Sequence, residues 1–202
     1  MNKTWTHQYP DTQLSKQGLE QAKAAGEYFR NVELDLIVYS PLLRAIQTAE
    51  AVMAHHSCPA ISNDLFVELR RPRELWGKHW LRPDSLWIMG SLYFFAGREH
   101  WHYSDEENLE EFRVRARRSL EWLSARPEQN ILVVSHKGFM VGMAERMKRD
   151  GLDTVRQYRR SLWKNFTVGN CCYITATWTP EGVDGETLTG TWSVEPGVRC
   201  TS

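Results

Sequence analysis

The apolar residues of the first fifty positions alternate between helical and strand spacing. Over about residues 16–30 they recur every three or four positions, which predicts a helix, and Ser15 can cap its first turn. The short run Leu34–Tyr39 is mostly apolar, as expected for a strand buried in a sheet. A second helix should start directly after it. Pro41 suits a first helical position, and Ser40 can accept a bond from an orphan backbone N–H.

The same alternation returns in the second half of the chain. Ile131–Ser135 is the strongest buried-strand pattern in the sequence, and a helix over about 139–150 should follow it. Before this strand, apolar residues at helical spacing predict a helix over about 109–123, which Arg126-Pro127 should end. Ser104 and Glu107 have the spacing of a capping box and could start that helix.

Two more strands are expected near the end of the chain, at Cys171–Trp178 and Thr187–Val194, joined by a turn rich in Pro and Gly. A strand followed by a helix occurs twice before them. This order of elements predicts an α/β fold with a mainly parallel central sheet, in one domain spanning residues 1–202. In such sheets, ligands lie beyond the carboxyl ends of the strands.

Residues 70–105 interrupt this regular order with an aromatic-rich insertion. Its large rings stand among basic residues and prolines: Trp76, Trp80, Trp87, Tyr93, Phe94, Phe95, Trp101 and Tyr103. Such clusters usually form core or a subunit interface, so the segment could join copies of the chain into a homo-oligomer. The sharper interpretation is an apolar lid over a substrate pocket.

Composition removes several classes of protein. Lys+Arg and Asp+Glu number 25 each among 202 residues, so no overall basic field points to nucleic acid, and any anion site must be local. No apolar run is long enough to span a bilayer, and Met1–Trp5 does not resemble a secretion signal. The four cysteines show neither metal-ligand spacing nor a disulfide framework. We therefore expect a cytoplasmic protein with no metal and no membrane partner.

Polar residues follow both predicted parallel strands. Arg44 lies one turn into the helix after the first strand, and His136 and Lys137 follow the second. These positions share one edge of the sheet, and a helix starting near Phe139 adds free N–H groups there. The combination suits a compact dianion such as phosphate. Taken singly, each residue has a plainer explanation: a structural histidine, a solvated arginine and a surface lysine.

Two carboxylic acids could serve such a site as proton donors. Glu68 follows the apolar run Leu65–Val67, and Glu74 lies a little further on. The alternative is that both are surface residues paired with neighbouring arginines. The nearby arginines have two possible roles as well: they could extend an anion site or merely solvate a loop. They are Arg70, Arg71 and Arg73.

Three motifs, in this order and spacing, resemble those of the histidine phosphatase (phosphoglycerate-mutase-like) superfamily. The first two are Leu14-Ser15-x-x-Gly18-x-x-Gln21-Ala22 and Ser40-Pro41-x-x-Arg44-Ala45-x-x-Thr48-Ala49-Glu50. The third is Val133-Val134-Ser135-His136-x-Gly138. The stretch from Glu68 through Gly77 is similar to the region that carries the acid of this family. The resemblance covers about residues 11–175.

The resemblance implies a three-layer α/β/α sandwich and metal-independent chemistry on a small-molecule phosphate ester. In this family a histidine attacks phosphorus and a phosphohistidine forms, without a cofactor. Carried over by motif, Arg44 clamps the phosphate, His136 is the second, phosphate-binding histidine, and Glu68 is the proton donor, with Glu74 as the weaker alternative. Lys137 would join Arg44 and His136 in binding phosphate, although the family often has glycine at that position.

The nucleophile is where this sequence departs from the family. Members open with an apolar strand that ends in Arg-His-Gly, and nothing here matches it. His7 is the nearest candidate, yet no apolar strand and no arginine precede it. We therefore expect a member truncated before that motif, with unpaired strand edges where a central strand belongs. We expect a histidine-type phosphatase impaired by the missing nucleophile, or alternatively a non-catalytic relative that binds phosphate or acts as a scaffold.

Overall fold

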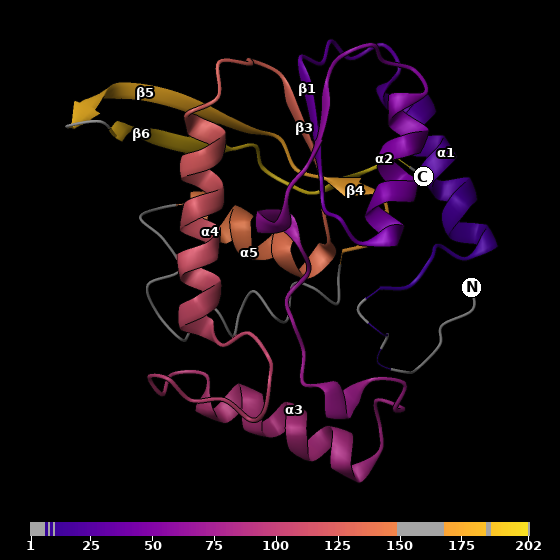
Figure 1. Ribbon diagram of the computed structural model, residues 1–202, viewed down its shortest axis with the longest axis vertical. Coiled ribbons are helices and arrows are strands. Elements are labelled where there is room, and N and C mark those ends of the chain that lie inside the picture. Colours follow the sequence, from indigo (N-terminus) through magenta and orange to yellow (C-terminus); the bar gives the residue numbers. More distant parts are fainter. Residues whose placement is uncertain (1–6, 8, 10, 149–167, 185–186, 202) are drawn as a thin grey trace.

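The computed structural model describes residues 7, 9, 11–148, 168–184 and 187–201 (Figure 1). The helices are α1 (Lys16–Phe29), α2 (Leu43–Met53), α3 (Pro83–Phe95), α4 (Leu109–Ser124) and α5 (Lys137–Met147). Two short 3₁₀ turns, η1 (Asp64–Phe66) and η2 (Arg73–Leu75), lie between β2 and α3. The strands are β1 (Leu36–Tyr39), β2 (Ala60–Ser62), β3 (Ile131–Val134), β4 (Cys172–Tyr173), β5 (Ala176–Asp184), β6 (Thr187–Val194) and β7 (Arg199–Cys200).

A parallel three-stranded sheet forms the centre, in the order β2-β1-β3. Successive side chains of β1 point to opposite faces, as the pleat requires. Leu36 and Val38 pack in a cluster with residues of α4 and α5, whereas Ile37 packs with residues of α2. Helices therefore cover both faces, and the predicted three-layer α/β/α arrangement with a mainly parallel sheet is confirmed.

Most element boundaries follow the sequence pattern, and two helix starts do not. The Ser15 hydroxyl accepts a bond from the Gly18 N–H and caps α1 as predicted. The predicted start of α2 at Pro41 was wrong, because the helix begins at Leu43, whose N–H donates to Asp11 at 2.8 Å. The sequence could not show this cap, since 32 positions separate its two residues.

The predicted capping box at Ser104 and Glu107 was also wrong. The box is formed four residues later, by Asn108 and Glu111, each of which binds the backbone N–H of the other. Glu107 instead pairs with Arg115, through a hydrogen bond of 2.6 Å from Arg115 Nε. Glu107 is thus held in a partly buried ion pair, and Glu111 is the residue that completes the capping box.

The prediction of unpaired strand edges beside a missing central strand stays a prediction. β1 and β3 are directly paired, from Leu36 with Ile131 to Tyr39 with Val134, so β1 has partners on both edges. Among the described residues, β3 pairs with β1 alone.

The closing strands form two small antiparallel sheets. β5 and β6 make a long hairpin that projects from the side of the molecule away from α1 (Figure 1). β4 pairs with β7, and a disulfide joins Cys172 to Cys200 across that pair. The expectation that the cysteines form no disulfide was therefore wrong, because the fold brings together two residues that are 28 positions apart. Cys171 and Cys58 are free thiols.

The aromatic insertion lies across one end of the molecule. Its helix α3 runs beyond the end of α4 where that helix begins (Figure 1). The segment also contacts the start of the described chain, since His7 donates to the Lys78 carbonyl and Gly77 donates to that of His7, both at 2.8 Å. None of the helices in the described ranges has the length and apolar character needed to cross a bilayer.

The close approach of α1 to α2 gives a test of the fold. A side chain at Gly26 would overlap the Ala51 carbonyl oxygen, so Gly26→Ala should lower the free energy of unfolding by roughly 1–3 kcal/mol. Lys23→Ala on the exposed side of the same helix is the control and should change it by less than about 0.5 kcal/mol. Urea unfolding measures both, and equal stability of the two variants would contradict this packing.

Candidate functional site

The ends of β1 and β3 are joined through a serine and a histidine. Ser40 follows β1 and donates its backbone N–H to the Val134 carbonyl at 3.0 Å. His136 follows β3 as the N-cap of α5, and its Nε2 lies 2.8 Å from the Ser40 hydroxyl. Both side chains are buried. The polar residues that follow β1 and β3 are therefore held together by these buried hydrogen bonds.

Arg44 is held by the same histidine. Its Nε donates to His136 Nδ1 at 3.1 Å, so Nδ1 is an acceptor and the ring proton belongs on Nε2, directed at Ser40. Burial, together with the charges of Arg44 and Arg115, lowers the pKa of His136 to about 3. The ring is therefore neutral near pH 7 and acts as a fixed support for the Arg44 guanidinium.

Glu68 reaches the N-terminus of α5. Its carboxylate accepts bonds from the backbone N–H groups of Leu69 at 3.0 Å and Phe139 at 3.1 Å, and a longer one from Gly138 at 3.4 Å. A Cβ at Gly138 would lie 2.6 Å from Glu68 Oε1, so only glycine allows this approach. The carboxylate occupies the position that the helix dipole makes favourable for an anion.

Arg115 fixes the segment that carries Glu68. Its Nη1 donates to the carbonyls of Leu65 at 2.9 Å and Val67 at 3.0 Å, while Nε and Nη2 bind the buried Glu107 carboxylate. From the other side, the Ser135 hydroxyl donates to the Phe66 carbonyl at 2.7 Å. The chain before Glu68 is thus tied to both α4 and the end of β3.

Two more cations, Lys137 and Arg71, lie near Arg44 and Glu68. Lys137 donates from Nζ to the Val168 carbonyl at 3.2 Å, and its pKa is lowered by burial and, to a smaller extent, by Arg71, while Glu68 opposes the shift. The pKa of Arg44 is lowered chiefly by burial, with Glu68 and Asp11 opposing and Arg71 adding to the shift. Arg44, Lys137 and Arg71 therefore act on one electrostatic region around Glu68.

His7, near the start of the chain, contacts Arg71 of the aromatic insertion. Its ring stacks on Trp80 with centroids 4.3 Å apart, and its Nδ1 lies 3.4 Å from Arg71 Nη1. Burial and the Arg71 charge lower its pKa to about 4, so this ring is also neutral at pH 7. Its Nε2 is buried without a hydrogen-bond partner.

Four of the predicted residues meet at this edge: Arg44, Glu68, His136 and Lys137. Glu74 does not join them. Its carboxylate accepts a bond from the Ser104 hydroxyl at 2.7 Å, and that bond lowers the pKa of the acid. Asp11 and Arg115 were not predicted from the sequence, and Trp80 was assigned only to the aromatic insertion. Arg115 stands among other arginines of a helix, so nothing in the pattern separates it from solvated neighbours.

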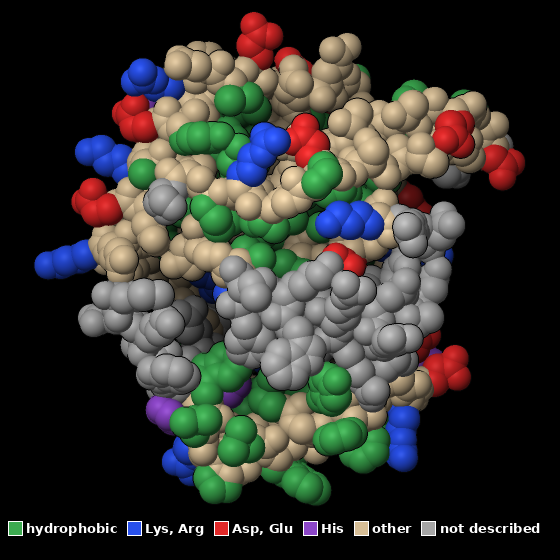
Figure 2. Space-filling view, turned by 180° about the vertical axis from the view of Figure 1, so that it is seen from behind, with side chains coloured by type: hydrophobic (Ala, Val, Ile, Leu, Met, Phe, Trp, Pro, Cys, Tyr) green, Lys and Arg blue, Asp and Glu red, His purple; other side chains and the backbone are tan. Residues whose placement is uncertain are grey.

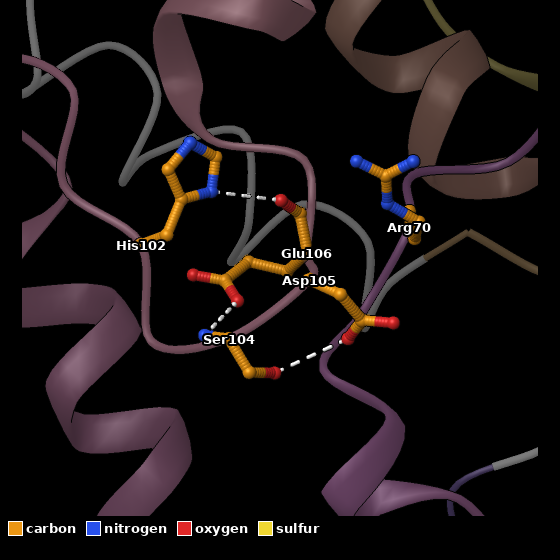
Figure 3. A pocket seen from close by; sticks show the side chains of 5 residues that line it. All are labelled: Arg70, His102, Ser104, Asp105 and Glu106. Atoms are coloured by element: carbon orange, nitrogen blue, oxygen red, sulfur yellow. Dashed lines mark hydrogen bonds between the residues drawn. The ribbon is translucent and has the colours of Figure 1, made fainter.

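Two cavities have Arg70 in their lining. The smaller, about 350 Å³, is lined by Arg70 and the loop residues His102, Ser104, Asp105 and Glu106 (Figure 3). The Glu106 carboxylate already accepts hydrogen bonds from the backbone N–H groups of Tyr103 and Ser104. The larger, about 650 Å³, includes Glu68, Arg70 and Arg115 in its lining, so it adjoins the predicted acid.

Comparison with known proteins agrees with this geometry. A phosphoglycerate mutase-like protein of Arabidopsis thaliana is 27% identical over 74% of this chain and 68% of its own length. An uncharacterized phosphatase of Bacillus subtilis is 30% identical over 62% of this chain, which spans 60% of that relative. The structure of a mycobacterial glucosyl-3-phosphoglycerate phosphatase with inorganic phosphate superimposes with a TM-score of 0.71, at 18% identity, covering 96% of this chain and 92% of that one.

The family model of the histidine phosphatase superfamily (branch 1) matches residues 2–189, nearly the whole chain. The motif residues of that match lie where two strands of the parallel sheet end, as described above. The chain belongs to the histidine phosphatase superfamily.

Proposed function

We propose that this chain binds the phosphoryl group of a small phosphate monoester at the common end of β1 and β3. The observation that carries the proposal is the Arg44 guanidinium, held by the neutral His136 ring next to Lys137 and the N-terminus of α5. Arginine offers a planar pair of donors for phosphate oxygens, and the helix adds backbone N–H groups. Arg71 would enlarge the same cationic region.

The energetics favour a doubly charged ligand. Burial lowers the pKa values of Arg44 and Lys137, which means that desolvation penalises their charges. A phosphate dianion would offset this penalty by pairing with both cations in a region partly removed from water. The names of two relatives, a phosphatase and a phosphoglycerate mutase-like protein, support phosphate-ester chemistry.

The organic part of the ester has room beside the acid. The cavity of about 650 Å³ adjoins Glu68 and holds both apolar residues such as Leu65 and charged ones such as Arg70. A leaving-group oxygen placed between phosphate and this cavity would lie on the Glu68 side. This position supports Glu68 as the proton donor, a role in which it must leave the N–H groups of α5 and take up a proton.

We further propose that this sequence hydrolyses the bound ester negligibly. All seven histidines lie among the described residues. His136 has both ring nitrogens in hydrogen bonds, so neither is available to attack phosphorus. The remaining candidate for the nucleophile is His7, whose ring is stacked on Trp80. The other five histidines follow α2 or lie in the insertion, away from the ends of β1 and β3 in the sequence. The chain then acts as a phosphate-ester binder with a phosphatase framework.

Binding should depend on Arg44. Isothermal titration of the full chain with inorganic phosphate should show saturable binding, and Arg44→Ala should weaken it at least about 30-fold, the loss of roughly 2 kcal/mol expected for a charged donor pair. Arg82→Ala, in the insertion, is the matched control and should bind like the parent chain. If phosphate does not bind the parent chain at all, the proposed site is wrong.

Turnover should be negligible although binding persists. Incubation with a generic aryl phosphate should release no more product than the buffer blank, and mass spectrometry should detect no phosphohistidine. Clear hydrolysis that disappears in His7→Ala but survives in His79→Ala would identify His7 as the nucleophile. That result would overturn the proposal of a binder without turnover.

Glu68 should compete with the ligand. Its carboxylate occupies the α5 N-terminus, so Glu68→Gln should lower the dissociation constant for inorganic phosphate by roughly three- to tenfold, through loss of like-charge repulsion at similar size. Glu110→Gln on α4 serves as the control. Weaker binding in Glu68→Gln would instead mean that the carboxylate is needed to build the site.

Stability should fall in acid because two buried histidines resist protonation. The pKa values of His136 and His7 are lowered to about 3 and about 4 from 6.5, so the unfolded chain binds more protons between those limits. Their contribution is complete above pH 6.5 and is lost as the pH falls through this window, by about 1.4 kcal/mol per pH unit for each ring.

Urea unfolding between pH 5 and pH 6 isolates this effect. His136→Asn should reduce the slope of unfolding free energy against pH by about one proton relative to the parent chain, and His7→Asn should do the same. His79→Asn, which leaves both buried rings in place, is the control and should not change the slope. Identical slopes in all four proteins would show that neither ring is protected from protonation.

A further inference from the structure

Helix α3 exposes its largest side chains and buries smaller ones. Its buried side holds Ser85, Ile88 and Ser91, which are 0%, 2% and 8% exposed. On the other side, Trp87 is 72% exposed and Phe94 is 71% exposed, although Phe94 also meets the Tyr93 ring edge-on. A helix that is apolar all round is normally buried on all sides.

The exposed side of α3 is part of a larger apolar surface. Figure 2 shows green side chains gathered at the end of the molecule where α3 lies in Figure 1. Leu86, next to Trp87 in the helix, is 54% exposed, and Leu81, just before the helix, is 64% exposed. Scattered apolar residues need no explanation, but a contiguous group with two large rings indicates a surface that is covered in solution.

The centre of this surface is open at Gly90. A Cβ added there would meet no atom within 4 Å, so the backbone of α3 is accessible between the two large rings. Trp87 lies three positions before Gly90 and Phe94 four positions after it, so all three share one side of the helix. A small residue between two large ones forms a hollow that a side chain of another helix can enter.

The charged residues at the ends of α3 are complementary to each other. Arg82 and Lys78 lie at the N-terminal end with Asp84, which binds both of them. Glu99 lies just beyond the C-terminal end, where the helix dipole is also negative. The neighbouring Arg98 is turned to its own helix, with its guanidinium 4.5 Å from the centre of the Phe95 ring. If two copies of α3 pack antiparallel about a two-fold axis between positions 90 and 91, Arg82 of each faces Glu99 of the other. The same symmetry places each Trp87 against Phe94.

We infer that the outer face of α3 is the interface of a symmetric homodimer. The interface is isologous, with two Trp87–Phe94 contacts around the Gly90 hollow and two Arg82–Glu99 ion pairs at its rim. Trp is the residue type that most often dominates such interfaces. The inference does not depend on the proposed phosphate site, because it uses none of the residues placed there.

A membrane surface fits this face less well. Helices that lie in the membrane interface carry Lys and Arg on the side away from the lipid, whereas the opposite side of α3 is packed against its own protein. The acidic residues Asp84 and Glu99 would also stand among anionic head groups. Self-association satisfies both the rings and the charges.

Sedimentation velocity and light scattering of the full chain test the inference. The parent protein should have twice the mass of one chain at micromolar concentration, and Trp87→Glu should raise the dimer dissociation constant by about 30-fold or more. Val183→Glu, at an equally exposed apolar position on β5, is the control and should remain dimeric. Circular dichroism confirms that each variant is folded. A parent chain that is monomeric at about 100 μM overturns the inference.

A charge exchange tests the antiparallel geometry. Arg82→Glu and Glu99→Arg should each weaken the dimer, and the double variant should recover most of the loss, because each reversed residue again meets its opposite in the second copy. Failure of the double variant to recover would overturn the antiparallel arrangement. Binding of the parent chain to anionic phospholipid vesicles, lost in Trp87→Glu while the protein in solution stays monomeric, would replace the dimer by a membrane contact.

Discussion

The arrangement of the site depends on one uncharged imidazole. His136 receives the Arg44 guanidinium on one ring nitrogen and faces Ser40 with the other, so a single side chain sets the distance between the ends of β1 and β3. The ring can do this only while it is neutral, because a second proton would remove the acceptor and place two cations side by side. Burial and the arginines maintain that state. The same charges that suit the site to phosphate therefore keep its support uncharged.

Around this ring, the two halves of the chain hold each other in place. Arg115 of α4 binds the carbonyls that precede Glu68, and Glu68 in turn binds the first turn of α5, next to His136. Removing one partner of such a buried network leaves the others unsatisfied, so the cost exceeds that of a single hydrogen bond. The aromatic insertion begins two positions after Glu68, and its start is thereby fixed to the sheet.

Local chemistry explains what could be predicted from the sequence. β1 and β3 are short apolar runs, and Ser15 caps α1 with a bond only three residues long, so both were found. The choice between Ser104 and Asn108 as a cap depended on where Glu107 finds Arg115, and the pairing of Cys172 with Cys200 depended on the contact of β4 with β7. Motifs brought Arg44, Glu68 and His136 to one edge. The bond from Arg44 to His136 spans 92 positions and the one from Gly138 to Glu68 spans 70, so both follow only from the assembled fold.

The tie between β4 and β7 has a consequence for synthesis on the ribosome. Tyr173 of β4 packs against Phe29 of α1 and shares a hydrogen bond with the Tyr28 hydroxyl, while the disulfide next to it requires Cys200. Tyr28 and Tyr173 are 145 positions apart, so α1 leaves the ribosome long before the residues that cover its outer end. Until Tyr173 and Cys200 have been synthesised, that end of α1 has to persist without its final neighbours.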